Sequence, residues 1–305
     1  MVILCIGVAA DSTFLAGLRA VRSAGLEHRA VDIATVAMRG SVHIPLEDPT
    51  ATAIDTGSDV IRLDECTAVW CRLIDVSAYA PETHYAAAAA GHYQAFLRLF
   101  EHLPIRVMNP PLREATGATK VLHSVTLAAV GGWSVPRTCL TSNPDEARAF
   151  IADCPNGAIF KGASAVKTWA RQYEASDDKL LERLRRTPVL FQERIVGPDV
   201  RVHTVGTESF GEEIHSSELD YRTVLGENDY RPITLPDSVA EGCGRLTKRT
   251  RIPLLGIDFK IDAASGEWFF LEANSMPMFD GYDQRAGGAI SDAMARWLAG
   301  GAAAA

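Results

Sequence analysis

The stretch Leu255-Gly256-Ile257-Asp258-Phe259-Lys260-Ile261-Asp262, followed closely by Trp268–Asn274, decides the fold of this 305-residue chain. Apolar and polar residues alternate along the first stretch, which is typical of a strand with one buried face. Asp258 and Lys260 then share the other face. A short Ala-Ala-Ser-Gly segment separates the two stretches and is typical of a turn, so together they predict a β-hairpin.

Three oxygen-bearing side chains fall on the polar face of this predicted hairpin. Asp258 lies close to opposite Glu272, and Asn274 shares the face two residues further on. Hard oxygen ligands of this kind suit magnesium, which proteins usually share with substrate phosphates. We therefore expect Asp258, Glu272 and Asn274 to hold a metal. An ordinary solvated hairpin face with unrelated acids is the alternative.

A second informative segment runs from residue 191 to residue 202. It predicts a strand, a Gly-Pro turn and a returning strand. If the strand backbone is open beside Gln192 and Glu193, it can hydrogen-bond the edge of an adenine ring. Asp199 could then accept hydrogen bonds from ribose hydroxyls, and Arg201 could reach a phosphate. The alternative is an exposed strand with a paired aspartate and arginine.

Separated basic residues complete the candidate site. Lys161 ends an apolar strand immediately before a glycine, Lys120 lies on a predicted helix, and Arg222 ends the tripeptide Asp220-Tyr221-Arg222. Arg72, two residues after Trp70, could also face the cleft. Each of these could equally be an ordinary solvated charge. The phosphate loop G-x-x-x-x-G-K-[ST] is missing.

The order of predicted elements indicates an α/β protein. The N-terminal third alternates apolar strands with helical patterns, which favours a small, open, mostly parallel sheet. It lacks the dinucleotide motif G-x-G-x-x-G. Asn109-Pro110-Pro111 then interrupts both kinds of element and marks a domain boundary. A helix is expected over 114–130, and the C-terminal part is expected to be rich in strands until a helix at 290–298.

Composition excludes several classes of protein. The chain is 47% hydrophobic and 22% charged, which is typical of a folded globular protein. Its net charge of −8 disfavours a large nucleic-acid surface. The six cysteines form no C-x-x-C pair, and no apolar run approaches the ~20 residues of a membrane span. The first residues read as a strand rather than a signal peptide, so we expect a cytoplasmic protein without nucleic-acid or membrane partners.

In chain order, these residues resemble the ATP-grasp superfamily over about residues 109–298. The resemblance rests on Lys120, Phe160-Lys161, Gln192-Glu193, Gly197-x-Asp199-x-Arg201, Gly256-x-Asp258 and Leu271-Glu272-Ala273-Asn274. Within the superfamily, the chain is similar to the ribosomal-protein glutamate ligase branch, including the peptide-macrocyclising ligases that make graspetides. Motifs such as Ile214-His215-Ser216 and Asp220-Tyr221-Arg222 support that second group.

The resemblance implies a small N-terminal open parallel-sheet domain followed by a two-part ATP-grasp fold. The expected units are an N-terminal α/β domain over 1–107, a central subdomain over 108–190, a C-terminal subdomain with the Mg/ATP site over 191–299, and a tail over 300–305. The implied roles are ATP binding by Lys120, Lys161, Gln192, Glu193 and Asp199, catalysis by Arg201 and Arg222, and metal binding by Asp258, Glu272 and Asn274.

The implied activity is that of an ATP-dependent carboxylate–amine or carboxylate–hydroxyl ligase. Such an enzyme forms an acyl phosphate and releases ADP and phosphate, using ATP and Mg²⁺, with two ions expected. The expected substrate is a peptide in natural-product biosynthesis, and a homodimer is the expected assembly. A ligase that joins small molecules or amino acids is the main alternative. An ATP-grasp kinase and an inactive nucleotide-binding module are the others.

Overall fold

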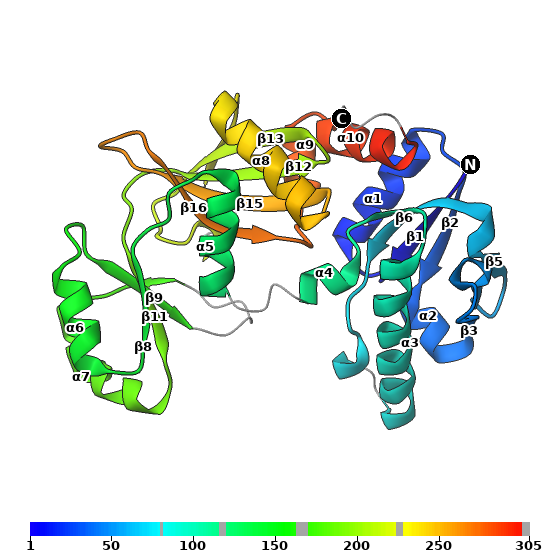
Figure 1. The fold of residues 1–305 in the computed structure, drawn as a ribbon, viewed down its shortest axis with the longest axis horizontal. Helices are drawn as coiled ribbons and strands as arrows, with labels where there is room; N and C mark the ends of the chain where they lie inside the picture. The colour runs from blue at the N-terminus through cyan, green and yellow to red at the C-terminus, as the bar shows by residue number, and fades with distance from the viewer. Residues whose placement is uncertain (80–81, 116–119, 163–169, 224–227, 301–305) are drawn as a thin grey trace.

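The computed structural model describes residues 1–79, 82–115, 120–162, 170–223 and 228–300, apart from the side chains of 83, 114, 115 and 120–122. Figure 1 shows three main sheets with helices packed around them. The N-terminal sheet lies at one end of the molecule, a sheet from the middle of the chain at the other end, and a C-terminal sheet between them. The protein therefore has the mixed α/β architecture that the sequence predicts. No helix of the described part is long and apolar enough to cross a membrane.

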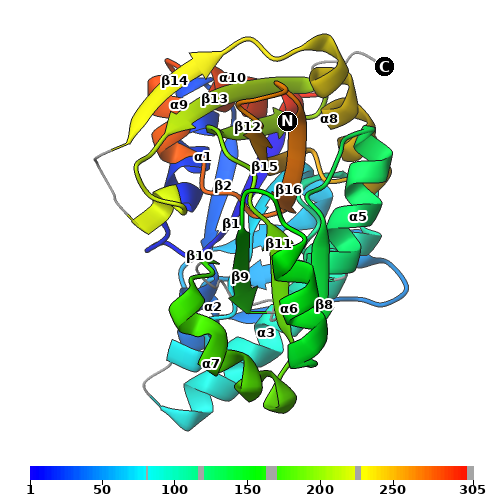
Figure 2. The ribbon, with the colours of Figure 1, turned by 90° about the vertical axis from the view of Figure 1, so that its left-hand side faces the viewer.

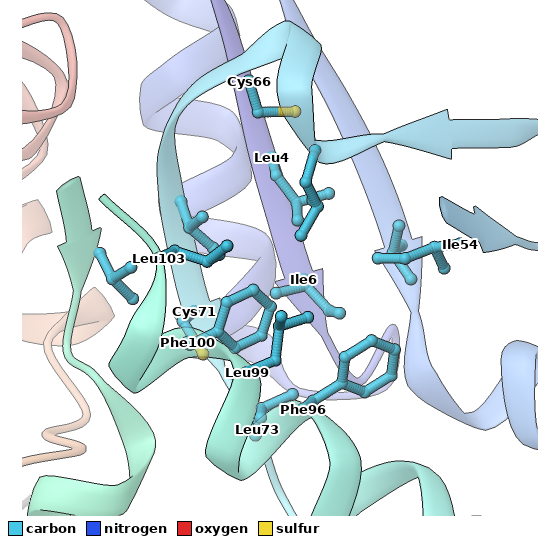
Figure 3. Packing of buried hydrophobic residues seen from close by; sticks show 14 of the residues in the cluster. Leu4, Ile6, Ile54, Cys66, Cys71, Leu73, Phe96, Leu99, Phe100 and Leu103 are labelled. Carbon is cyan, nitrogen blue, oxygen red and sulfur yellow. The ribbon is translucent and has the colours of Figure 1, made fainter. Parts of the chain in front are cut away.

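The N-terminal sheet is parallel and has the order β2-β1-β6-β7. Helices pack on both of its faces, and one face carries a core that includes Leu4, Ile6, Phe96 and Phe100 (Figure 3). The expected small open parallel sheet is confirmed. Its elements are β1 (Val2–Gly7), α1 (Ser12–Ser23), β2 (His28–Asp32), α2 (Ile33–Arg39), β6 (Cys66–Arg72), α3 (Thr83–His102) and β7 (Arg106–Met108), with a small antiparallel sheet of β3 (Ser41–His43), β4 (Ala53–Asp55) and β5 (Val60–Arg62).

The middle sheet is antiparallel and has the order β10-β9-β11-β8. Asn143 caps the helix that packs on it, because its side chain accepts a hydrogen bond from the Asp145 N–H at 3.0 Å. The elements are β8 (Thr138–Thr141), α6 (Pro144–Ala152), β9 (Ala158–Gly162), β10 (Arg171–Gln172), α7 (Asp178–Leu181) and β11 (Val189–Glu193).

The C-terminal sheet is antiparallel, with the order β14-β13-β12-β15-β16. Its strands are β12 (Asp199–Val205), β13 (Glu208–His215), β14 (Asp229–Ile233), β15 (Leu254–Ile261) and β16 (Trp268–Asn274). Helices α5 (Lys120–Gly131) and α8 (Asp237–Thr250) lie side by side over one face of it (Figure 2). Trp133 stacks on Phe270 there, with ring centroids 5.4 Å apart. Polar side chains lie on the opposite face of the sheet, and the candidate site is on that face.

Two further helices follow the last strand, α9 (Asp280–Arg285) and α10 (Ala289–Leu298). Helix α10 packs against α1, so the C-terminal end of the chain lies against the N-terminal sheet (Figure 1). One apolar cluster includes Trp70 from β6 and Met294 from α10. The N-terminal and C-terminal sheets therefore share a core. The predicted domain boundaries stay predictions.

The helix expected over 114–130 is confirmed in its described residues, by α4 (Pro111–Ala115) and α5, and residues 116–119 lie outside the described part. Pro111 begins α4, because proline fits the first turn of a helix. The structure corrects two other expectations about individual elements. Helix α8 interrupts the stretch expected to be strand-rich. Its two glycines lower helix propensity, although Val239, Cys243 and Leu246 have the spacing of a buried helical face. Strands β11 and β12 belong to different sheets and form no hairpin.

Asn109 fastens the N-terminal sheet to the C-terminal sheet. It follows β7 directly, is 5% exposed and has a left-handed backbone with φ of 61°. Its side-chain amide donates to the carbonyls of Leu254, at 2.6 Å, and Ser275, and its side-chain oxygen accepts from the Leu254 N–H at 3.0 Å. Asparagine tolerates the left-handed region better than most residues. One side chain thus satisfies three backbone groups at the junction.

We expect Asn109→Ala to lower the free energy of unfolding by about 3 kcal/mol, because it leaves buried backbone groups unpaired and strains a left-handed residue. Asn109→Gly loses the same hydrogen bonds without the strain and should be about 1 kcal/mol less harmful. Urea denaturation of both variants checks this. Equal stabilities for the alanine and glycine variants would contradict the assigned backbone conformation.

Candidate active site

A cleft of about 1170 Å³ lies between the middle sheet and the polar face of the C-terminal sheet. Residues of β9 and β11 line one side, and residues of β12, β15 and β16 line the other. Lys120 begins α5, but its side chain lies outside the described part. The other residues that were assigned a binding or catalytic role all line the cleft: Lys161, Gln192, Glu193, Asp199, Arg201, Arg222, Asp258, Glu272 and Asn274.

Charged residues form a row across four neighbouring strands of the C-terminal sheet. Glu272 on β16 is opposite Asp258 on β15, as the sequence predicts for the hairpin. Asp258 is opposite Arg201 on β12, which is in turn opposite Glu212 on β13. Arg285 of α9 completes the row, because its guanidinium donates to both carboxylate oxygens of Glu212 at 2.7 and 2.6 Å. We call these five residues the charged row.

The central contact of the charged row is a buried ion pair. Arg201 Nη1 lies 2.7 Å from each carboxylate oxygen of Asp258, and the two side chains are 8% and 17% exposed. Burial raises the pKa of Asp258, and the negative charge of Glu272 acts in the same direction, while Arg201 opposes both. Asp258 is therefore fixed by Arg201 directly beside a second carboxylate, that of Glu272.

Gly256 gives the Arg201 guanidinium the space it occupies. A Cβ atom at this position would lie 2.1 Å from Arg201 Nη2 and 2.7 Å from the Pro277 Cβ. Any side chain larger than a hydrogen would push the guanidinium away from Asp258. Steric constraint alone, independent of any ligand, therefore explains why the residue two positions before Asp258 is a glycine.

A second ion pair lies two residues along the same strands. Lys260 Nζ is 2.9 Å from Asp199, and both side chains are largely buried. Burial raises the pKa of Asp199 to about 6, although Lys260 acts in the opposite direction. Asp199 lies beside the cleft as expected, but its partner in the structure is Lys260. The sequence indicates that Lys260 shares the face of Asp258 and does not reveal its pairing.

Arg222 lies on the segment between β13 and β14 and is held by its neighbour. Its Nε and Nη2 donate to the two carboxylate oxygens of Asp220 at 2.7 and 2.6 Å. Burial alone would raise the pKa of Asp220, but the hydrogen bonds and charge of Arg222 outweigh it, and the pKa is lowered. The tripeptide Asp220-Tyr221-Arg222 thus presents a positioned guanidinium to the cleft.

An aromatic wall, formed by Tyr221, Tyr230 and Tyr282, adjoins this end of the cleft. The guanidinium of Arg285 lies over the rings of Tyr230 and Tyr282, at 4.0 and 4.8 Å from their centroids. The Tyr221 and Tyr282 hydroxyls are 3.3 Å apart. Sequence reasoning missed this wall and the Glu212–Arg285 pair, because residues of four separate segments form them and no motif joins those segments.

The open strand expected beside Gln192 and Glu193 is wrong. Strand β11 lies between β8 and β9, and the Glu193 N–H is already bonded to the Arg137 carbonyl at 2.9 Å. The Gln192 side chain donates to the Thr138 hydroxyl at 3.1 Å, and Glu193 pairs with Arg137 at 2.8 Å. Both residues line the cleft, but their backbone cannot offer an unpaired edge to a ligand.

The donor set at the charged row fits a hard cation. Among the residues that the structure describes, no group of three or more His, Cys, Asp or Glu side chains could hold a metal ion by itself. Asp258, Glu272 and Asn274 instead bring two carboxylates and an amide together, with the Asn274 Nδ2 at 3.2 and 3.4 Å from the carboxylates. Turning that amide by 180° would present its oxygen instead. Such an incomplete oxygen set suits magnesium, which completes its coordination with water and phosphate oxygens.

Comparison with known proteins supports a fold assignment. No protein-family model matches the chain, and no curated protein matches its sequence. Solved structures do match it over nearly its whole length. The macrocyclase MdnC from Microcystis aeruginosa MRC, bound with precursor peptide MdnA, is 20% identical with a TM-score of 0.83, and the match covers 98% of this chain and 100% of MdnC.

Two other solved ligases give the same result. A RiPP-associated ATP-grasp ligase from Chryseobacterium gregarium, in complex with ADP and a leader and core peptide, is 19% identical with a TM-score of 0.83, covering 99% of this chain and 97% of that one. The ATP-grasp ligase PsnB, complexed with minimal precursor, is 25% identical with a TM-score of 0.75, covering 96% and 97%. The chain therefore has the ATP-grasp fold, as its resemblance implies.

We expect Gly256→Ala to lower the rate of ATP turnover about a hundredfold, because it displaces the Arg201 guanidinium from Asp258. The matched control is Gly244→Ala on α8, where an added Cβ meets no atom within 4 Å. That variant should turn over ATP normally. Steady-state ADP release measures both, and normal turnover by the Gly256 variant would remove the Arg201–Asp258 pair from the catalytic arrangement.

Proposed function

We propose that this protein is an ATP-dependent ligase that activates a carboxylate as an acyl phosphate and joins it to an amine or hydroxyl, with a peptide as substrate. The observation that carries the proposal is the charged row. It places two adjacent carboxylates, one of them fixed by a guanidinium, in the lining of a cleft in an ATP-grasp fold. Adjacent carboxylates at such a cleft are suited to hold the magnesium that accompanies a nucleotide.

The residues of the cleft would bind different parts of the metal–nucleotide complex according to where they lie. Asp258, Glu272 and Asn274 would hold magnesium, whose chemistry is to neutralise and orient phosphate oxygens. Lys161 lines the opposite side of the cleft on β9, where it would bind the phosphates, with Lys120 assigned the same role by resemblance. Gln192 and Glu193 would contact the adenine through their side chains. Asp199 would accept from the ribose when ionised.

The two arginines of the site would have different roles in the transfer. Arg222, held by Asp220, would stabilise charge on the γ-phosphoryl group while a carboxylate oxygen of the substrate attacks its phosphorus and ADP leaves. The acceptor nitrogen or oxygen then attacks the acyl carbon, loses its proton, and expels inorganic phosphate. Arg201, buried against Asp258, would act mainly by fixing that carboxylate. Its role differs in this respect from the direct phosphate contact that the sequence alone suggests.

The matched structures favour a peptide substrate. The MdnC and Chryseobacterium gregarium structures contain peptides and match nearly the whole chain. A ligase for small molecules would use the same phosphate chemistry and is the second candidate.

Six free cysteines support a reducing compartment such as the cytoplasm, and a homodimer is the base-rate assembly.

The direct test of the proposal is ATP turnover in the presence of magnesium and hydroxylamine. The panel would contain acidic peptides, dipeptides and free amino acids, with products read by mass spectrometry. We expect ADP together with a hydroxamate of an acidic peptide. A hydroxamate of a free amino acid would favour the small-molecule ligase. Release of AMP, or a stable phosphorylated product without hydroxamate, would contradict the ligase mechanism.

We expect Glu272→Gln to abolish measurable ATP turnover while the protein stays folded, because an amide cannot replace a negatively charged metal ligand. The control is Glu267→Gln on the same hairpin, whose side chain is exposed and lies outside the cleft lining. That variant should keep wild-type turnover. Circular dichroism would verify the fold of both proteins. Wild-type rates in the Glu272 variant would remove the metal assignment.

A further inference from the structure

Residues 275–280, which follow the proposed metal ligand Asn274 directly, are fastened along their backbone. We call them the anchored segment. Asn109 donates to the carbonyl of Ser275, and Arg72 Nη1 donates to the carbonyl of Pro277 at 3.2 Å. His203 Nε2 lies 3.2 Å from the carbonyl of Met278, and burial lowers the pKa of His203, so the imidazole is neutral and can donate there. Three of these carbonyls are therefore held by side chains from elsewhere in the fold.

The far end of the anchored segment is also held by the N-terminal sheet and its first helix. Phe279 is fully buried and contacts Trp70 edge-to-face, with ring centroids 6.3 Å apart. Asp280 accepts hydrogen bonds from the Ser12 and Thr13 hydroxyls at the start of α1, at 3.1 and 3.3 Å. Most of these anchors come from the N-terminal third of the chain. The N-terminal domain thus fixes the path of the chain just beyond the proposed metal site.

Arg72 is the charged anchor, and it lies beneath the cleft rather than facing it. Its side chain is 7% exposed, its Nε is 2.5 Å from Asp11 Oδ2, and it is not among the cleft-lining residues. The expectation that it could face the cleft is therefore wrong. Asp11 is itself fixed, because its other oxygen caps α1 by accepting from the Thr13 N–H at 2.9 Å. A buried ion pair anchored to a helix start gives Arg72 one well-defined geometry.

The Pro277 carbonyl held by Arg72 belongs to a residue that lies beside the charged row. A Cβ atom on Gly256 would lie 2.7 Å from the Pro277 Cβ and 2.1 Å from Arg201 Nη2, so these two groups border the same small space. His203, which contacts the next carbonyl, lies 3.5 Å from Arg201 Nε. Movement of the anchored segment would therefore disturb Arg201, and through it Asp258. Arg72 is thus linked to Asp258 through Pro277 and Arg201.

We propose that Arg72 is a positioning residue for the metal–nucleotide site, acting from the N-terminal domain through Pro277 on Arg201 and Asp258. The inference rests on the proposed function, because it takes Asp258, Glu272 and Asn274 as the metal ligands. Arg72 touches neither substrate nor metal. It holds the segment that follows Asn274, and Pro277 of that segment lies beside the guanidinium that binds Asp258.

Arg72→Lys tests the proposal, because a lysine ammonium keeps the charge beside Asp11 but lacks the planar fork that reaches Pro277 at the same time. We expect the Kd for ADP with magnesium to rise about tenfold, the order seen when residues that support metal ligands are changed. The Kd for ADP in EDTA should stay unchanged. Isothermal titration calorimetry of the full-length protein measures both constants without requiring the peptide substrate.

Arg106→Lys is the matched control. Arg106 also belongs to the N-terminal part and donates to a carbonyl of the C-terminal part, that of Leu298 at 3.1 Å, but it lies outside the cleft lining. We expect both of its ADP affinities to stay at the wild-type values. Asp11→Asn serves as a second variant if Arg72→Lys unfolds. The asparagine amide oxygen still caps α1, but the neutral side chain holds Arg72 less strongly. We therefore expect a smaller rise in the Kd for ADP with magnesium than Arg72→Lys gives.

The outcomes separate this inference from the proposed function. If magnesium does not strengthen ADP binding to the wild-type protein, the metal assignment fails and takes the inference with it. If magnesium strengthens ADP binding to the wild-type protein, and to the Arg72→Lys and Asp11→Asn variants by the same factor, only the inference about Arg72 is overturned. Arg72→Lys could also lower ADP affinity by the same factor with and without magnesium, or Arg106→Lys could lower it as much as Arg72→Lys does. Either result would show a general structural role and would also overturn the inference.

Discussion

The buried ion pair between Arg201 and Asp258 is the interaction on which the arrangement of the cleft depends. Removing either partner would leave an uncompensated charge in a site with little solvent, at a cost of about 3–5 kcal/mol. Gly256 leaves room for the guanidinium, and Pro277 closes that space from the other side. Glu272 places a second carboxylate beside this pair, on the neighbouring strand. The site therefore combines a fixed carboxylate with a second one next to it, an arrangement that suits a divalent cation.

Three parts of the fold converge on this pair. The C-terminal sheet provides the charged row, and the middle sheet provides the opposite side of the cleft with Lys161, Gln192 and Glu193. The N-terminal sheet contributes no residue to the cleft lining from its strands, yet Asn109 and Arg72 bind the chain around Asn274. The small first domain is thus a structural support for the proposed metal site, joined to it by hydrogen bonds and a shared apolar core.

The sequence predicts local features of this site well and distant pairings poorly. The opposition of Asp258 and Glu272 follows from alternation within one hairpin, and the register confirms it. The partner of Arg201 could not be predicted, because β12 pairs with β15 across some fifty residues of intervening chain, which includes α8. The expectation of an open backbone at Gln192 failed for the same reason. Strand β8 is remote in sequence, and only the fold brings it beside β11.

The most direct test of the proposed metal site is the anomalous scattering of manganese in crystals grown with ADP. Mn²⁺ replaces Mg²⁺ at oxygen sites and can be located without assuming its ligands. We expect a peak in contact with the carboxylates of Asp258 and Glu272 and with the nucleotide phosphates. Bound ADP with no manganese at these carboxylates, or with manganese held by other side chains, would contradict it.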